Sequence, residues 1–116
     1  MAAEKRIERL KEFLKEELSG ILDRELEFPD ESLVTITKVE VSPDKYYATA
    51  FISVLGADTE KIMEILRKNV YNMQQLLNRR VRMRPVPRIS FAIDEGEMER
   101  EKIEKSLAKL KRDGGL

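Results

Sequence analysis

The spacing of apolar residues switches between a helical and a strand-like pattern along this chain, and this switching most limits the possible folds. Over residues 4–26, leucines and isoleucines recur every three or four positions with charged residues between them. This spacing predicts an amphipathic helix of about six turns. Pro29 follows shortly afterwards and ends it, because the residue before a proline disfavours the helical conformation.

A second helical series spans residues 62–77, again with apolar side chains every three or four positions. Asp58 or Thr59 is the expected N-cap, since short side-chain oxygens accept the free N–H groups of a first helical turn. Asn78 is the expected last residue, because Asn tolerates the left-handed conformation that ends many helices. The pattern therefore predicts a long central helix.

Three segments instead carry the features of strands. Residues 33–41 are rich in β-branched side chains, residues 46–55 alternate small and branched apolar residues, and residues 89–93 alternate in the same way. Residues 42–45 (Ser-Pro-Asp-Lys) suit a type I turn, so the first two strands form a hairpin. The apolar phase of the first strand changes partway, which predicts a bulge or burial on both faces. Residues 97–111 predict a highly charged final helix with a thin apolar stripe.

Composition excludes several classes of protein. The 116 residues include no Cys and no His, which removes disulfides, thiol chemistry, Cys/His zinc sites and the commonest general base. Carboxylate pairs such as Glu16–Glu17 and Glu97–Glu99 are better explained as solvated helix faces than as metal ligands. No apolar run approaches the roughly 20 residues of a membrane span. We therefore expect a soluble, cytoplasmic, non-catalytic domain without a metal or cofactor.

The formal charge is zero, with 22 basic and 22 acidic residues, but the distribution is uneven. All of the acids lie outside residues 67–88, a segment with seven bases. A local positive surface attracts phosphate whatever the total charge of the chain is. The candidate RNA-binding residues are Arg67, Lys68, Arg79, Arg80, Arg82, Arg84 and Arg88.

The arginines of this basic segment could form a regular ladder. In an extended chain, Arg80, Arg82 and Arg84 would point to one side, about 6.5–7 Å apart, which resembles the phosphate spacing of a nucleic-acid strand. The predominance of Arg over Lys also favours phosphate recognition. The alternatives are a solvated surface, ion pairs with the acidic helices, or a protein-interaction module that meets an acidic partner or another copy of the chain without contacting RNA.

Aromatic residues offer a second possible contact with RNA. Tyr46, Tyr47 and Phe51 could form a base-stacking platform, but tyrosines at a hairpin more often pack against residues of the neighbouring strand. Lys38 and Lys45 lie near this hairpin and are either accessory contacts or solvated residues. We therefore favour a packing role for these aromatic residues.

Two stretches resemble motifs of the bacterial ribosome-binding factor A family. Residues 34–48 look like its V-T-(I/V)-x-x-V-x-V-S-x-D-x-x-x-A hairpin, and residues 76–94 look like its L-x-x-R-(L/M)-R-x-x-x-x-P-x-L-x-F-x-x-D segment. The two motifs occur in the correct order and spacing. The resemblance covers about residues 5–107.

The resemblance implies an α+β, type II KH-like fold with the order helix-strand-strand-helix-strand and a three-stranded sheet. Residues 1–94 would form the KH-like RNA-binding domain, and residues 95–116 a charged C-terminal helix and tail. The Gly-x-x-Gly loop of standard KH domains is absent from the long-helix region. Asn69-Val70-Tyr71 stands where the family has a small-x-Gly interruption, so a kink at Asn69 is left open.

The resemblance also implies a function. The family associates with the free small (30S) ribosomal subunit, assists its late maturation, including processing of precursor 16S rRNA, and takes part in adaptation to cold. It has no catalytic residues to carry over. The expected partners are therefore the small subunit and its 16S rRNA, bound by a monomer through the basic segment.

Overall fold

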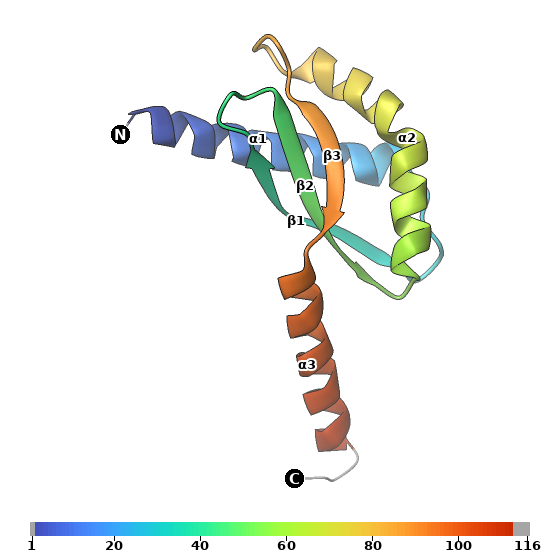
Figure 1. Cartoon of the computed structure of the whole chain (residues 1–116). Coiled ribbons are helices and arrows are strands. Elements are labelled where there is room, and N and C mark those ends of the chain that lie inside the picture. The colour runs from blue at the N-terminus through green and yellow to red at the C-terminus, as the bar shows by residue number, and fades with distance from the viewer. Residues whose placement is uncertain (1, 113–116) are drawn as a thin grey trace.

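The computed structural model describes residues 2–112, which form three helices and three strands in the predicted α+β order (Figure 1). In chain order the elements are α1 (Ala2–Glu25), β1 (Leu33–Val41), β2 (Tyr47–Leu55), α2 (Thr59–Arg80), β3 (Arg88–Ile93) and α3 (Glu95–Arg112).

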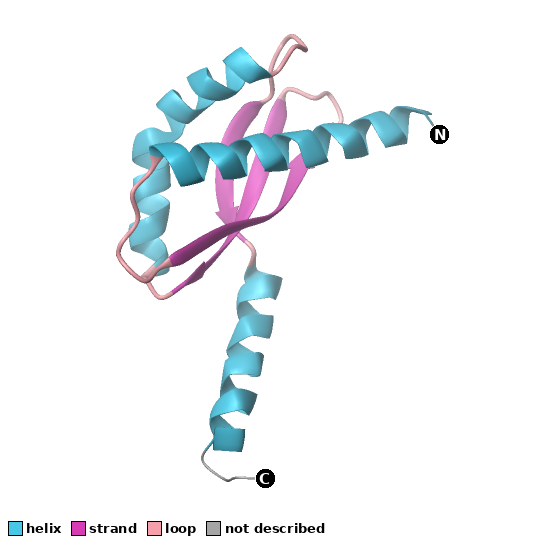
Figure 2. Ribbon diagram, turned by 180° about the vertical axis from the view of Figure 1, so that it is seen from behind, coloured by secondary structure: helices cyan, strands magenta, loops and turns pink. Residues whose placement is uncertain are grey.

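The three strands form one sheet in the order β1-β2-β3. β1 and β2 pair antiparallel as the predicted hairpin, and β3 pairs parallel to β2, with Tyr47 opposite Arg88. Side chains from α1, α2 and one face of the sheet form a single buried cluster. Figures 1 and 2, which view the molecule from opposite sides, show α1 crossing that face. On the other face, no helix of residues 2–112 lies over β3 and the start of β2 (Figure 1).

A bulge in β1 explains the change of apolar phase in the sequence. The pairing with β2 shifts between Ile36 and Lys38, so Thr37 has no partner of its own. The extra residue returns the following side chains to the original face, and Val39 is buried beside Ile36. The prediction of a bulge is thus confirmed, and it allows both halves of β1 to contribute to one core.

The β1–β2 turn is held by its own polar side chains. The Lys45 N–H donates to the Ser42 carbonyl at 2.9 Å, as a type I turn requires. The Asp44 carboxylate accepts the Ser42 hydroxyl at 2.6 Å and the Tyr46 N–H at 2.9 Å. These hydrogen bonds, the Ser42 one foremost, lower the pKa of Asp44. Tyr46 therefore belongs to the turn, and β2 begins at Tyr47, one residue later than predicted.

The N-terminal half of α2 follows the prediction, and the helix bends midway. The Asp58 carboxylate caps it by accepting the Glu60 N–H at 3.2 Å. The axis changes direction between the two halves of the helix (Figures 1 and 2). In mid-helix the Asn69 side-chain amide donates to the Ile65 carbonyl at 2.8 Å. A side chain that competes for a carbonyl of the helical ladder bends a helix, which gives a physical cause for the change of direction.

The C-terminus of α2 differs from the prediction. The helix ends at Arg80 and not at Asn78, and Val81 then adopts an extended conformation with φ −95° and ψ 126°. The Val81 N–H donates to the Leu77 carbonyl at 3.0 Å. The Arg84 guanidinium donates to the carbonyls of Val81 and Asn78, at 2.6 and 3.3 Å. Because these donors satisfy the last carbonyls, no left-handed residue is needed at Asn78.

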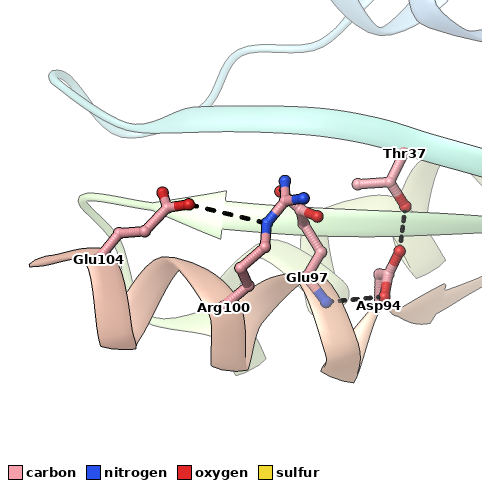
Figure 3. Close-up of polar contacts among 5 residues, drawn as sticks. All are labelled: Thr37, Asp94, Glu97, Arg100 and Glu104. Atoms are coloured by element: carbon pink, nitrogen blue, oxygen red, sulfur yellow. Dashed lines mark hydrogen bonds and ion pairs between the residues drawn. The ribbon is translucent and has the colours of Figure 1, made fainter.

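α3 begins at Glu95, two residues before the predicted start, because Asp94 caps it. The Asp94 carboxylate accepts the Glu97 N–H at 3.0 Å and, with its other oxygen, the Thr37 hydroxyl at 2.6 Å (Figure 3). The Met98 sulfur accepts the Val54 N–H at 3.2 Å. Beyond these contacts the helix extends away from the sheet (Figure 1). Two apolar residues of the predicted stripe, Ile103 and Leu107, are 55% and 49% exposed.

Candidate nucleic-acid interface

The seven predicted basic residues are all exposed, but they lie on three different elements. Arg67 and Lys68 lie in the middle of α2, twelve residues before Arg79 and Arg80, which corresponds to about 18 Å along a straight helix. Two further residues lie in the loop that follows α2, and the seventh opens β3. The basic residues therefore follow the chain from α2 through the loop to β3, and they do not lie along one straight segment.

The predicted ladder of Arg80, Arg82 and Arg84 is wrong. Arg80 is helical, and its Nε atom pairs with a carboxylate oxygen of Glu17 on α1 at 3.1 Å. Arg84 turns back toward the helix and donates to the Met83 carbonyl at 2.8 Å, in addition to the α2 carbonyls. The free carbonyls and the negative end of the helix dipole attract this cation. Two of the three ladder arginines thus have partners within the molecule.

The remaining basic residues also differ in whether their side chains have a partner within the molecule. Lys68 forms an ion pair with Glu64 at 3.2 Å, one helical turn away. Among the described residues, no side-chain hydrogen bond or ion pair involves the other four, Arg67, Arg79, Arg82 and Arg88. An exposed guanidinium without an internal partner keeps all five of its N–H donors for a ligand.

A groove between α1 and α2 adds one arginine that the sequence did not indicate. Arg24, in the last turn of α1, lies across the groove from Arg79 and Arg80. The other lining residues are Ile21, Glu25 and Leu76. Arg24 lies between Asp23 and Glu25 in the sequence, so the acidic net charge of this stretch conceals it. Only the packing of the two helices brings it to the basic segment.

The sheet brings aromatic residues to the same region. The Arg88 N–H donates to the Tyr46 carbonyl at 2.8 Å, and Tyr47 is the pairing partner of Arg88 on β2. Tyr46 and Tyr47 are 54% and 57% exposed. Both rings are therefore accessible to solvent, and their role in packing against a neighbouring strand stays a prediction.

Gln74 holds this arrangement in place. Its side-chain amide donates to the Pro87 carbonyl at 3.1 Å, and its side-chain oxygen accepts the Ile89 N–H at 2.8 Å. One α2 side chain thus satisfies two backbone groups at the beginning of β3. The position of Arg88 relative to the C-terminal half of α2 is fixed by these bonds.

Residues 2–112 contain no group of three or more His, Cys, Asp or Glu side chains that could hold a metal ion. Of the predicted solvated carboxylates, Glu17 instead pairs with Arg80, and Glu97 accepts an Arg100 donor at 2.6 Å (Figure 3). None of the helices described is both long enough and apolar enough to cross a membrane.

Comparison with known proteins identifies close relatives. The family model described as ribosome-binding factor A matches residues 6–107. The chain is 37% identical over 110 residues to ribosome-binding factor A of Macrococcus caseolyticus, which covers 93% of this chain and 96% of that protein. It is also 37% identical over 92 residues to the Nitrosococcus oceani protein, over 78% of this chain and 72% of that one.

Solved structures show the same fold. The crystal structure of ribosome-binding factor A from Thermus thermophilus superposes with a TM-score of 0.67 at 24% identity, over 75% of this chain and 94% of that one. A homology model of the Thermus thermophilus factor, fitted into a cryo-EM map of a 30S–RbfA complex, gives 0.61 at 28% identity, over 70% and 87%. The solution structure of a Thermotoga maritima protein, a possible member of the same family, gives 0.57 at 29% identity, over 74% and 88%.

Proposed function

The chain belongs to the ribosome-binding factor A family, and from this premise we propose that it binds the free small ribosomal subunit in the cytoplasm and assists its late maturation, including processing of precursor 16S rRNA. It acts as a binding protein without catalytic residues. The likeness to a factor fitted into a 30S complex supports this partner. The observation that carries the proposal is the set of exposed, unpaired arginines in residues 67–88 of a family member.

We further propose that the basic segment contacts the phosphates of 16S rRNA. Arg67, Arg79, Arg82 and Arg88 provide unshared guanidinium donors, which suit bidentate contacts with phosphate oxygens. The other three predicted residues, Lys68, Arg80 and Arg84, add to the positive charge of the segment. All acidic residues lie outside this segment, so the remaining surface repels phosphate and favours one orientation on an RNA-rich particle.

A charge-reversal variant tests this site. We expect Arg79→Glu/Arg82→Glu/Arg88→Glu to lose co-sedimentation with purified small subunits, because it removes three phosphate contacts without breaking an internal hydrogen bond. The matched control, Lys5→Glu/Arg9→Glu/Lys61→Glu, makes the same change of charge at three exposed residues outside the segment and should bind normally. Binding by the first variant at the strength of the wild type would refute this site.

The salt dependence of binding provides an independent measurement. Each phosphate contact contributes about −0.7 to −0.9 to the slope of log affinity against log salt. The triple variant should therefore have a slope about 2–3 units shallower than the wild type, even where weak binding remains measurable. A flat response of the wild type, together with binding to nuclease-treated subunits, would instead indicate a protein-interaction module.

The maturation role is tested in cells. Cells depleted of the protein are expected to accumulate small subunits that contain precursor 16S rRNA, which Northern hybridisation detects. The control triple variant should restore processing, and the Arg79/Arg82/Arg88 variant should not. Normal processing in depleted cells would contradict the role in maturation.

A further inference from the structure

The face of the sheet opposite α1 carries aromatic and cationic side chains. Along β2, Ala48, Ala50 and Ile52 are buried in the core, so the alternate residues Tyr47 and Phe51 point to the other face. On β3 the same alternation places Arg88 on this open face beside Tyr47, because Ile89 is buried. β1 contributes Lys38, whose ammonium lies 4.8 Å from the centre of the Phe51 ring.

The residues between the two rings are small. Thr49 lies on β2 between Tyr47 and Phe51, and Ser90 is its partner on β3, with the two hydroxyl oxygens 3.4 Å apart. No bulky side chain of β2 or β3 therefore separates the rings, which lie about 13 Å apart along the strand. Between the two aromatic positions, the surface of the open face thus consists of small hydroxyl side chains.

Electrostatics favour a polyanion on this face. Glu40 is the only acid in the three strands, and it pairs with Lys11 of α1 at 3.2 Å. Asp94, which follows β3, lies close enough to Lys38 for their charges to attract each other, so the unshared positive charge of this face is that of the Arg88 side chain. The Arg88 side chain has no hydrogen-bond or ion-pair partner among the described residues, and Arg88 is the pairing partner of the exposed Tyr47. A cation next to an uncovered aromatic ring can hold a phosphate while the attached base stacks on the ring.

We propose that this surface, formed by Tyr47, Phe51, Lys38 and Arg88, is a stacking face for unpaired bases of single-stranded RNA. The inference rests on the proposed RNA contact of the basic segment, and it adds a base-binding surface on the opposite side of the sheet from the α1–α2 groove. Tyr47 is the main platform, since Lys38 lies against the Phe51 ring. Arg88 joins the two surfaces, because it belongs to both.

The test uses a fluorescein-labelled, mixed-sequence, 12-nucleotide single-stranded RNA, and affinity is measured by anisotropy. Removing the ring with Tyr47→Val should weaken binding roughly 5- to 150-fold, as expected for the loss of one stacked base. Tyr47→Phe keeps the ring without the hydroxyl and should bind within about twofold of the wild type. A duplex RNA of the same sequence should bind both variants equally, because its bases are already stacked.

Two controls separate stacking from a general loss of structure. Val is well suited to a strand, so Tyr47→Val should keep the urea midpoint of the wild type. Phe13→Leu removes an aromatic ring that is 39% exposed on α1, away from the open face, and should leave RNA binding unchanged. An equal loss of binding in Phe13→Leu would overturn the inference, since the effect would not depend on the open face.

The outcomes distinguish this inference from the proposed function. If Arg79→Glu/Arg82→Glu/Arg88→Glu abolishes binding to RNA and to small subunits while Tyr47→Val binds both like the wild type, the stacking face is refuted and the basic segment stands. If Tyr47→Val weakens binding to nuclease-treated subunits as much as to intact ones, the face contacts protein and the inference is overturned. If the wild type binds neither RNA nor subunits, the proposed function fails, and the inference with it.

Discussion

At the scale of single residues, neighbours in the sequence have different roles because their backbone surroundings differ. Arg82 and Arg84 stand two positions apart in one loop, yet Arg84 donates to the terminal carbonyls of α2, while Arg82 has no partner among the described residues. Both lie in the acid-free segment 67–88, which makes both candidate phosphate ligands. Only Arg82 keeps its guanidinium for a ligand, and a substitution of Arg84 would also damage the end of a helix.

Gly56 occupies a backbone conformation and a position that only glycine fits without strain. Its φ of +76° lies in the left-handed region, and a Cβ there would come within 2.5 Å of the Glu31 carbonyl oxygen. We expect Gly56→Ala to lower the free energy of unfolding by about 2–4 kcal/mol, measured by urea denaturation, because the conformation and the clash both cost energy.

Gly96 provides the matched comparison. It lies in the first turn of α3, where a Cβ would meet no atom closer than the Asp94 carboxylate at 3.7 Å. Gly96→Ala should therefore be neutral or add up to about 1 kcal/mol to the stability of α3. Equal destabilisation by the two substitutions would contradict the argument from the Gly56 backbone.

At the scale of elements, α3 is attached to the sheet mainly near its beginning. The Asp94 side chain joins α3 to β1 through Thr37, across the end of the sheet (Figure 3). Farther along, Ile103 and Leu107 are 55% and 49% exposed, so the helix adds little to the core. The orientation of α3 relative to the sheet therefore depends on a few polar contacts. The division of the chain into a KH-like domain, residues 1–94, and a C-terminal helix and tail, residues 95–116, remains a prediction.

The Asp94 contact predicts a pH dependence confined to α3. The Thr37 hydroxyl, foremost, and the Glu97 N–H lower the pKa of Asp94 below its ordinary value of 3.8. A carboxylate whose pKa is lowered by folding stabilises the folded state fully above its unfolded pKa, and the contribution is lost as the pH falls through the folded pKa. The protection of α3 amides from hydrogen exchange, taken relative to the intrinsic exchange rate at each pH, should therefore stay constant above about pH 4 and decrease as the pH falls below that value.

Thr37→Val tests the cause of this shift. The substitution removes the hydroxyl donor while keeping the shape of the side chain, so the pKa of Asp94 should rise toward 3.8. Carboxyl resonances followed by NMR during acid titration measure the change. Asp44, whose lowered pKa depends on Ser42, serves as the internal control and should titrate as in the wild type. An unchanged Asp94 titration would show that Thr37 is not the cause.

At the scale of the whole molecule, stability and binding have different physical origins. The core is apolar and shared by α1, α2 and the sheet, and most of the ion pairs among described residues lie at the surface, as Lys68–Glu64 does. Exposed pairs contribute about 0–1 kcal/mol each. Contact with RNA, in contrast, depends on unshared positive charge and on the release of counterions.

Salt should therefore separate the two properties. Raising NaCl from 0.1 to 1 M shortens the screening length from about 10 to about 3 Å. We expect Tm, measured by circular dichroism, to move by less than about 5 °C. The affinity for RNA should fall at least about 100-fold over the same range if three phosphates are contacted. A large fall in Tm would instead show that ion pairs stabilise the fold.

The sequence was sufficient for the features that depend on near neighbours. Apolar spacing predicted the order and type of all six elements, and the phase change in residues 33–41 predicted the bulge at Thr37. The predicted end of α2 was wrong because Arg84, whose side chain donates to carbonyls at that end, lies in a loop whose path the local pattern does not specify. The predicted arginine ladder failed for the same reason.

The sequence alone therefore determined which elements form and where the unbalanced positive charge lies, since periodicity and composition are local properties. The tertiary structure alone decided which arginines stay unpaired, that Arg24 joins Arg79, and that Tyr47 lies beside Arg88. These relations depend on helix packing and on parallel pairing between β2 and β3, two strands separated along the chain by the whole of α2. Contacts between such distant segments are set by how the whole core packs, which no local pattern encodes.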